Sequence, residues 1–90
     1  MAKRHEKLET LVRGFANHHR ISILERIIKK PGMSVAAVAK AERMNLKTCS
    51  EHLRRLTVAG LITKIADGRR VEHEPTALGK KVAKFLQQIA

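Results

Sequence analysis

The sequence predicts a mostly α-helical domain with one small β-hairpin, and three observations lead to that prediction. Five segments carry apolar residues at helical spacing. In the last third of the chain, a β-branched run meets an Asp-Gly pair, which is typical of a hairpin turn. Ninety residues with 43% hydrophobic content suit one small core. We expect a single domain over residues 1–90, with helices at about 3–16, 18–29, 34–43, 46–59 and 76–89 and a hairpin at about 61–74.

The first two predicted helices differ in how much of their surface is apolar. Segment 3–16 has one apolar stripe among charged residues, formed by Leu8, Leu11, Val12 and Phe15. In segment 18–29, isoleucine and leucine cover more than half of the circumference, so this helix is expected at the centre of the core. Asn17 can cap its amino end, and the run Lys29-Lys30-Pro31-Gly32 ends it.

Segments 34–43 and 46–59 are predicted to form a helix-turn-helix. The first has an apolar face made of Val35, Val38 and Ala39, and the second has one made of Cys49, His52, Leu53 and Leu56. Ser34 and Asn45 stand just before the two runs, where a side-chain oxygen can accept an unpaired backbone N–H. Gly60 follows the second run, where a left-handed residue can end a helix. Two capped helices joined by about three residues make this motif.

Polar and cationic side chains cover the other face of segment 46–59, and they favour binding in the major groove of double-stranded DNA. Base edges or adjacent phosphates are expected to be contacted by Asn45, Lys47, Thr48, Ser50 and Arg54. The phosphate backbone is expected to be held by Arg55, Arg69 and Arg70. Glu51 would repel phosphate, but its carboxylate can accept a hydrogen bond from the amino group of cytosine. A charged surface without a ligand is the simpler interpretation of such a helix when it occurs alone.

The β-branched run 61–66, the Asp67-Gly68 pair and residues 69–74 predict the hairpin. A two-stranded hairpin is unstable alone, so it must pack on the helices, and we expect the contacts to come from Leu61, Ile65 and Val71. The tip with Arg69 and Arg70 would stay in solvent as a wing. Beyond it, Thr76 can cap a last helix with an apolar stripe of Leu78, Val82, Phe85, Leu86 and Ile89.

The charge of the chain narrows the class of partner. Nineteen basic and eight acidic residues give a net charge of +11 and a pI near 10.8, which favours a polyanion. The basic residues are spread over several helices and a hairpin and do not follow one long amphipathic helix, so nucleic acid is favoured over a membrane surface.

Cysteine and hydropathy bear on the expected compartment. A single cysteine excludes an intrachain disulfide. The segment Met1 to His5 has no secretion signal, and no apolar run approaches the roughly 18 residues of a membrane span. These features predict a cytoplasmic protein without a membrane partner.

Several stretches resemble the ArsR-like winged helix-turn-helix repressors. The family's recognition helix often has the pattern S-x-x-T-V-S-x-H-L-x-x-L followed by A-G-L-[IV], matched here by Asn45, Thr48, Cys49, Ser50, His52, Leu53, Leu56, Ala59, Gly60, Leu61 and Ile62. The family's entry to its second helix, its wing and the start of its last helix resemble Phe15 to Leu24, Asp67 to Arg70 and Thr76 to Gly79. The resemblance covers roughly residues 15–80. MarR-like and PadR-like regulators share the wing and the A-G-L turn but are less close.

This resemblance implies a sequence-specific regulator of transcription that binds double-stranded DNA, most simply a repressor acting by occlusion. In the family, the first and last helices build a two-fold dimer, which implies a homodimer interface containing Leu8, Leu11, Val12, Phe15, Val82, Phe85, Leu86 and Ile89. Such a dimer would place its recognition helices in major grooves about 10 bp apart, or a multiple of that, on a pseudo-palindrome. The same stripes would complete the core if the protein were a monomer.

Two positions depart from the family pattern. Arg43 stands in the turn where glycine is common, so the turn must form without the residue best suited to a left-handed conformation. Glu51 stands where a basic or amide side chain is usual. The target sequence therefore cannot be copied from a relative.

A metal site is not expected, although ArsR-like proteins include metal sensors. The family's sensing cysteines lie on the first helix of the motif, where residues 33–38 offer no ligand. Cys49 takes the place of an apolar residue and is expected in the core. His18 and His19 are adjacent, hence about 100° apart on a helix, and cannot bind one ion from a single face. No cofactor is implied.

The sequence also argues against an enzyme, because it has no paired carboxylates, nucleophile and base arrangement, or phosphate-binding glycine loop. Two alternatives to DNA binding stay open. A winged helix can serve as a protein interaction module that docks on an acidic surface, or it can bind structured RNA.

Overall fold

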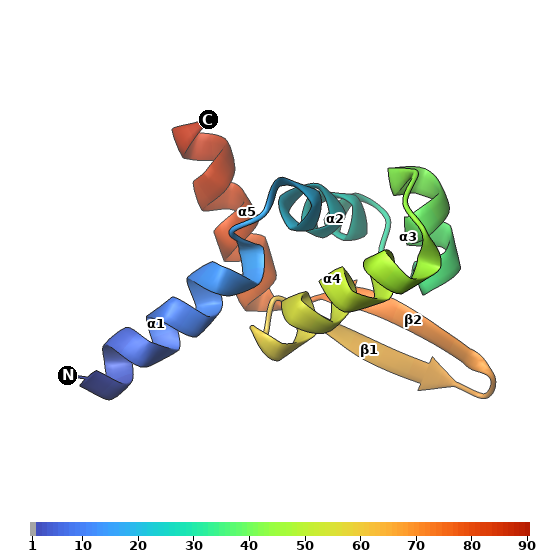
Figure 1. Ribbon diagram of the computed structural model, residues 1–90, viewed down its shortest axis with the longest axis horizontal. Coiled ribbons are helices and arrows are strands. Elements are labelled where there is room, and N and C mark those ends of the chain that lie inside the picture. Colours follow the sequence, from blue (N-terminus) through green and yellow to red (C-terminus); the bar gives the residue numbers. More distant parts are fainter. Residues whose placement is uncertain (1) are drawn as a thin grey trace.

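The computed structural model describes residues 2–90 and confirms a mostly α-helical fold with one antiparallel hairpin (Figure 1). Met1 belongs to the predicted domain and to the amino-terminal segment but lies outside the described residues. The elements are α1 (Ala2–Phe15), α2 (His18–Lys29), α3 (Val35–Glu42), α4 (Leu46–Val58), β1 (Ile62–Asp67), β2 (Arg70–Pro75) and α5 (Ala77–Ile89). The predicted boundaries differ from these by no more than one residue.

Side-chain caps fix where four of the helices begin, as the sequence predicts. The Oδ1 atom of Asn17 accepts from the backbone N–H groups of His19 and Arg20 at 2.9 and 3.2 Å. Three further caps hold α3, α4 and α5 in the same way, with Ser34, Asn45 and Thr76 accepting from the third residue beyond at 3.1, 2.8 and 3.0 Å. Each cap satisfies a backbone donor that has no partner within its helix, so the helix starts are determined locally.

The α2 helix lies at the centre of the core. Ile23, Leu24 and Ile27 are fully buried, and α2 packs against all four other helices and β2. The remaining core residues come from every side of it: Met33, Val38, Ala39, Cys49, Leu53, Leu56, Leu61, Ile62, Val82 and Ala83. The prediction that Cys49 packs in the core is confirmed, since its side chain is inaccessible to solvent.

The hairpin meets the core differently from the prediction. Leu61 is buried, but Ile65 and Val71 are 47% and 44% exposed. The register pairs Ile65 with Glu72 and Val71 with Ala66, so the side chains of Ile65 and Val71 lie on opposite faces of the hairpin. They therefore cannot both face the helices, and the prediction for these two residues is wrong.

Only the base of the hairpin contacts the core. Ile62 is buried, and so is His73 on the neighbouring strand. The ring Nδ1 atom of His73 lies 2.8 Å from the carbonyl oxygen of Met33, and the two residues also form a backbone bridge. The hairpin is thus fixed to the loop between α2 and α3, while its outer part extends into solvent.

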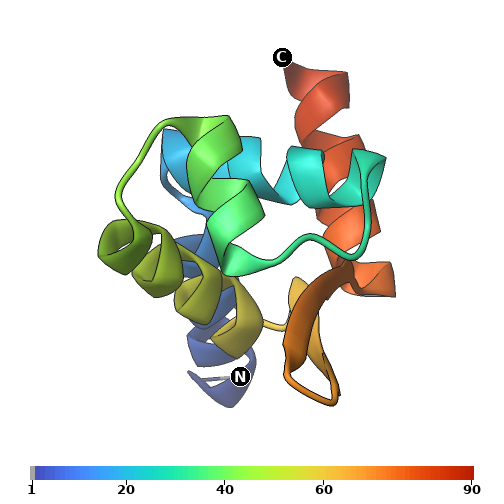
Figure 2. The ribbon, with the colours of Figure 1, turned by 90° about the vertical axis from the view of Figure 1, so that its right-hand side faces the viewer.

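The arrangement places α4 beside the hairpin. Figures 1 and 2 show the two elements next to one another, on the part of the molecule away from the carboxyl terminus. The amino-terminal turns of α1 and the carboxyl-terminal turns of α5 project away from the core (Figure 1). Gly14 allows α1 to approach α4 closely, because a Cβ atom there would collide with the side chain of Ala59.

Candidate nucleic-acid interface

The residues predicted to contact DNA all lie on the surface, around α4 and at the hairpin tip. They are exposed without exception: Asn45, Lys47, Thr48, Ser50, Glu51, Arg54, Arg55, Arg69 and Arg70. Residues 47, 50, 51 and 54 follow helical spacing, so their side chains leave α4 on the face opposite Cys49, Leu53 and Leu56. The structure therefore brings these four residues together on one side of α4, while Arg69 and Arg70 lie at the hairpin tip.

Two features set where α4 begins and how it is presented. Asn45 uses its side-chain oxygen for the cap on Thr48, which leaves its amide nitrogen as the group able to contact DNA. Arg43 ends α3 with φ 56° and ψ 45°, a left-handed conformation in a residue that is not glycine. The predicted tight turn between the two helices does form. Its left-handed conformation costs Arg43, as an L-residue with a side chain, about 1–2 kcal/mol.

Glu51 and Arg54 form a two-pronged ion pair on the outer face of α4. The Nε and Nη2 atoms of Arg54 donate to the two carboxylate oxygens of Glu51 at 2.9 and 2.7 Å. Arg55 adds one longer contact, from its Nε atom to Oε1 of Glu51 at 3.3 Å. The hydrogen bond from Arg54 lowers the pKa of Glu51 to about 2, so the carboxylate is charged at neutral pH.

Arg20 connects α4 to the junction of α1 and α2, a role that the sequence does not reveal. Its guanidinium donates to the carbonyl oxygens of Gly14 and Arg13 at 2.9 and 3.2 Å, at the carboxyl end of α1. It also lies 3.2 Å from Nδ1 of His52. Because arginine has no acceptor, this nitrogen of His52 is unprotonated. Burial, followed by the charge of Arg20, lowers the pKa of His52.

The wing has a short tip with two arginines. Gly68 has a φ of 62°, which supplies the left-handed turn residue between the strands. Arg69 completes the turn and Arg70 begins β2; both are exposed, and Arg70 has a 3.9 Å contact with Glu72. That distance and exposure make a weak ion pair that a phosphate can displace.

Arg13 lies near Arg54 and Arg55 where α1 crosses α4. An open groove of about 200 Å³ is lined there by Arg13, Arg54 and Arg55 together with Thr10, Gly14, Val58 and Ala59. Arg13 was not singled out from the sequence, because its place beside α4 depends on how α1 packs. It pairs with Glu9 at 3.1 Å on the exposed face of α1.

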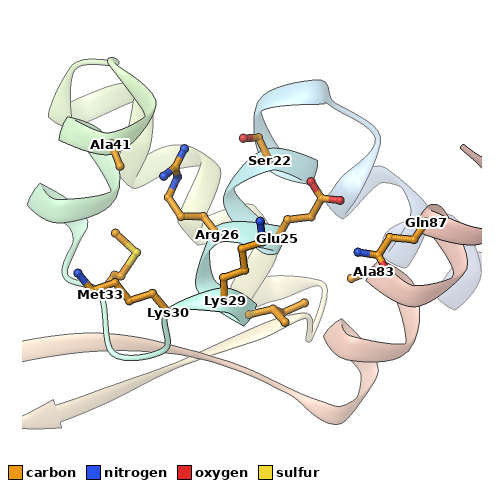
Figure 3. Close-up of a pocket in the computed structure, with 10 residues that line it drawn as sticks. Ser22, Glu25, Arg26, Lys29, Lys30, Met33, Ala41, Ala83 and Gln87 are labelled. Carbon is orange, nitrogen blue, oxygen red and sulfur yellow. The ribbon is translucent and has the colours of Figure 1, made fainter.

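A larger groove of about 520 Å³ lies between α2, α3 and α5 (Figure 3). Arg26, Lys29 and Lys30 stand around it beside Glu25, and Met33 and Ala83 supply apolar lining. Arg26 is held by the nearly buried carboxylate of Glu42 at 2.7 Å. The groove contains side chains of both charges and the negative carboxyl end of α2. It therefore favours neither anionic nor cationic ligands.

Within residues 2–90, no group of three or more His, Cys, Asp or Glu side chains is arranged to hold a metal ion. Burial raises the pKa of the Cys49 thiol, which keeps it in the protonated form that binds metals poorly. None of the described helices is both long and apolar enough to span a bilayer.

The terminal helices expose apolar side chains, although some residues predicted for the dimer interface pack against the core of the monomer instead of facing solvent. Leu8, Val12, Phe85 and Ile89 are 41%, 49%, 54% and 63% exposed. Leu11, Phe15 and Leu86 pack partly against the core. Val82, the remaining residue of the predicted interface, is buried in the core.

Comparison with known proteins agrees with this architecture. Residues 17–63 match the family model of the winged helix-turn-helix DNA-binding domain. The chain belongs to this winged helix-turn-helix family. This is a family of DNA-binding domains and not of enzymes, and a similar solved domain is a possible regulator of transcription. No curated protein sequence matches the winged helix-turn-helix chain.

Three solved structures illustrate the likeness. The homodimeric winged helix-turn-helix domain of Mb0332 from Mycobacterium bovis, a possible ArsR-family regulator, is 25% identical with a TM-score of 0.89 over 98% of this chain and 82% of that one. NolR from Sinorhizobium fredii is 22% identical, with a TM-score of 0.87 over 98% and 88%. FabT from Streptococcus pneumoniae, solved in complex with DNA, is 20% identical, with a TM-score of 0.72 over 78% and 51%. The predicted ArsR-like winged helix fold is thereby confirmed.

Proposed function

We propose that this protein is a homodimeric, sequence-specific regulator of transcription that acts in the cytoplasm as a repressor by occluding its DNA site. The observation that carries the proposal is the exposed polar face of α4 beside the arginine-tipped wing. A helix of this kind fits the major groove, and the net charge of +11 favours a polyanion.

Each part of the surface has a separate task in this proposal. Asn45, Lys47, Thr48, Ser50 and Arg54 contact base edges or the phosphates next to them, from the amino-terminal and middle turns of α4. Arg55, Arg69 and Arg70 hold the backbone on either side. Base contacts give sequence preference, whereas phosphate contacts give affinity that depends on salt.

The dimer of the proposal is built by α1 and α5. Each helix exposes apolar side chains, Leu8 and Val12 on α1 and Phe85 and Ile89 on α5, and the similar Mb0332 domain is a homodimer. We also assign Leu11, Phe15 and Leu86, which are partly buried beside them, to the edge of this interface. Two-fold symmetry then gives two recognition helices and a pseudo-palindromic site.

The direct test is a selection of bound sequences from a random duplex pool, followed by footprinting of the selected site. We expect an enriched pseudo-palindrome with half-sites about 10 bp apart, or a multiple of that. A pool with no enrichment, or equal competition by structured RNA, would contradict the proposal. Binding to an acidic protein instead of DNA would favour an interaction module.

A further inference from the structure

The pairing of Glu51 with Arg54 restricts the guanidinium group to one orientation. Arg54 uses one edge, formed by Nε and Nη2, to bind both oxygens of Glu51. The adjacent edge, formed by Nη1 and the second Nη2 hydrogen, has no partner among the described residues. Two parallel N–H donors are therefore left in a fixed plane on the outer face of α4.

The same contact sets the direction in which Arg54 extends. Glu51 lies three residues before Arg54, one turn nearer the amino end of α4. Side chains on a helix already incline toward its amino end, and this ion pair draws the guanidinium further that way. The amino-terminal turns of a recognition helix are the part that approaches base edges.

From this arrangement, and resting on the proposed function, we propose that Arg54 recognises a guanine in each half-site and that Glu51 is the positioning residue that aims it. Guanine presents two acceptors, O6 and N7, on its major-groove edge, and two parallel N–H donors match them. Adenine presents only one acceptor together with a donor at the same place, so it cannot accept both bonds.

Glu51 acts through Arg54 and not as an independent reader of cytosine. Its two oxygens already accept three hydrogen bonds from Arg54 and Arg55. A carboxylate offers about four acceptor positions, so little capacity remains for a base. Its negative charge also offsets the two neighbouring arginines, which weakens their attraction to phosphate of any sequence. Both effects favour specificity over general affinity.

Arg55 provides the contrast within the same cluster. It holds Glu51 by one contact at 3.3 Å, and it lies one residue further round the helix, toward α1. Its guanidinium is therefore less constrained, and its backbone lies beside Gly14 of α1. Arg55 is expected to contact phosphate, so its removal should weaken binding to every sequence equally.

The experiment compares base preference in wild type, Glu51→Ala, Arg54→Ala and the double variant, each used to select duplexes from the same random pool. Arg54→Ala should lose the preference for one G:C pair in each half-site, a loss of about fivefold to 150-fold in discrimination. Glu51→Ala should reduce preference at that same pair. In the Arg54→Ala background, Glu51→Ala should have no further effect on base preference.

Two controls separate positioning from charge and from folding. Glu9→Ala removes a carboxylate that pairs with Arg13 on the surface of α1, and it should leave base preference unchanged. Replacing the assigned guanine by 7-deazaguanine removes one acceptor, so wild type should bind this duplex more weakly while Arg54→Ala should not distinguish it from guanine. Glu51 and Arg54 are exposed, and circular dichroism should show all variants folded.

The outcomes distinguish this inference from the function on which it rests. No enriched sequence for wild type would overturn both. An enriched site whose preferences survive Glu51→Ala would leave the regulator intact and overturn the role of Glu51. Loss of preference at different base pairs in the two single variants would make Glu51 an independent reader. Uniform loss of affinity in Arg54→Ala would make Arg54 a phosphate contact.

Discussion

Phe85 offers the sharpest test of the proposed dimer, because it is the largest side chain that α5 leaves in solvent. It is 54% exposed and does not belong to the core or to the side chains packed against it. A phenylalanine buries about 200 Å² when covered, so about 110 Å² remains available to a partner. At about 25 cal/mol per Å², covering it contributes about 2.7 kcal/mol per protomer.

A two-fold interface contains this residue twice, so Phe85→Ala should weaken the dimer by about 3–5 kcal/mol, depending on how completely the pair is covered. The dimer dissociation constant should rise by a factor of about 10² to 10⁴. Sedimentation equilibrium over a range of protein concentrations measures this constant directly. Circular dichroism should show an unchanged helical fold, since the monomer core does not use this side chain.

Lys84→Ala is the matched control. Lys84 is an exposed neighbour on the polar side of α5, and its truncation should change the dissociation constant by less than about threefold. If Phe85→Ala also stayed within threefold of wild type, α5 would not form the interface as proposed. If wild type itself sedimented as a monomer at all concentrations, the dimer would have to be abandoned.

Three further predictions concern the turn, the histidine at the helix junction and metals. Arg43→Gly relieves the left-handed strain and should raise the melting temperature by a few degrees, whereas Arg43→Ala should not. Folding lowers the pKa of His52, so below about pH 6.5 the unfolded chain binds a proton more readily than the folded chain does. The free energy of unfolding should therefore decrease as the pH is lowered, and His52→Gln should make this decrease smaller. Micromolar zinc or a chelator should change the affinity for selected DNA by less than about twofold, and a tenfold loss with zinc, about 1.4 kcal/mol of coupling, would restore a metal-sensing role.

The fold could be predicted from the sequence because its information is local. Asn17, Ser34, Asn45 and Thr76 each determine a helix start through a hydrogen bond that spans two or three residues. Apolar spacing likewise identified α2 as the central helix. Neither signal requires knowledge of tertiary contacts, which explains why boundaries agreed to within one residue.

The contacts that were missed depend on distant residues. Ile65 and Val71 look equivalent in sequence, and only the register of the hairpin places them on opposite faces. His73 is buried through a bridge to Met33, 40 residues earlier. Arg20 reaches His52 across 32 residues. Spacing along one element cannot reveal such partners.

The candidate site could be predicted from the sequence only in part. Its surface residues can be predicted from the helical spacing of α4. The ion pair between Glu51 and Arg54 cannot be predicted in that way. Position 51 has arginine both three and four residues later, and the sequence alone gives no reason to favour one partner. The structure distinguishes them, with two bonds to Arg54 and one to Arg55.

The measurement that bears most directly on DNA binding is the dissociation constant for selected and random duplexes, taken over a range of salt concentrations for wild type and the Arg69→Ala, Arg70→Ala variant. Wild type should bind both duplexes with a steep salt dependence and prefer the selected one. A dimer of the wing variant loses up to four phosphate contacts, so its log-log slope should flatten by up to about 3.6 on both duplexes, with the preference unchanged. Salt-insensitive or absent duplex binding by wild type would contradict the proposed function, and a changed sequence preference in the wing variant would show that the wing, and not α4, reads the bases.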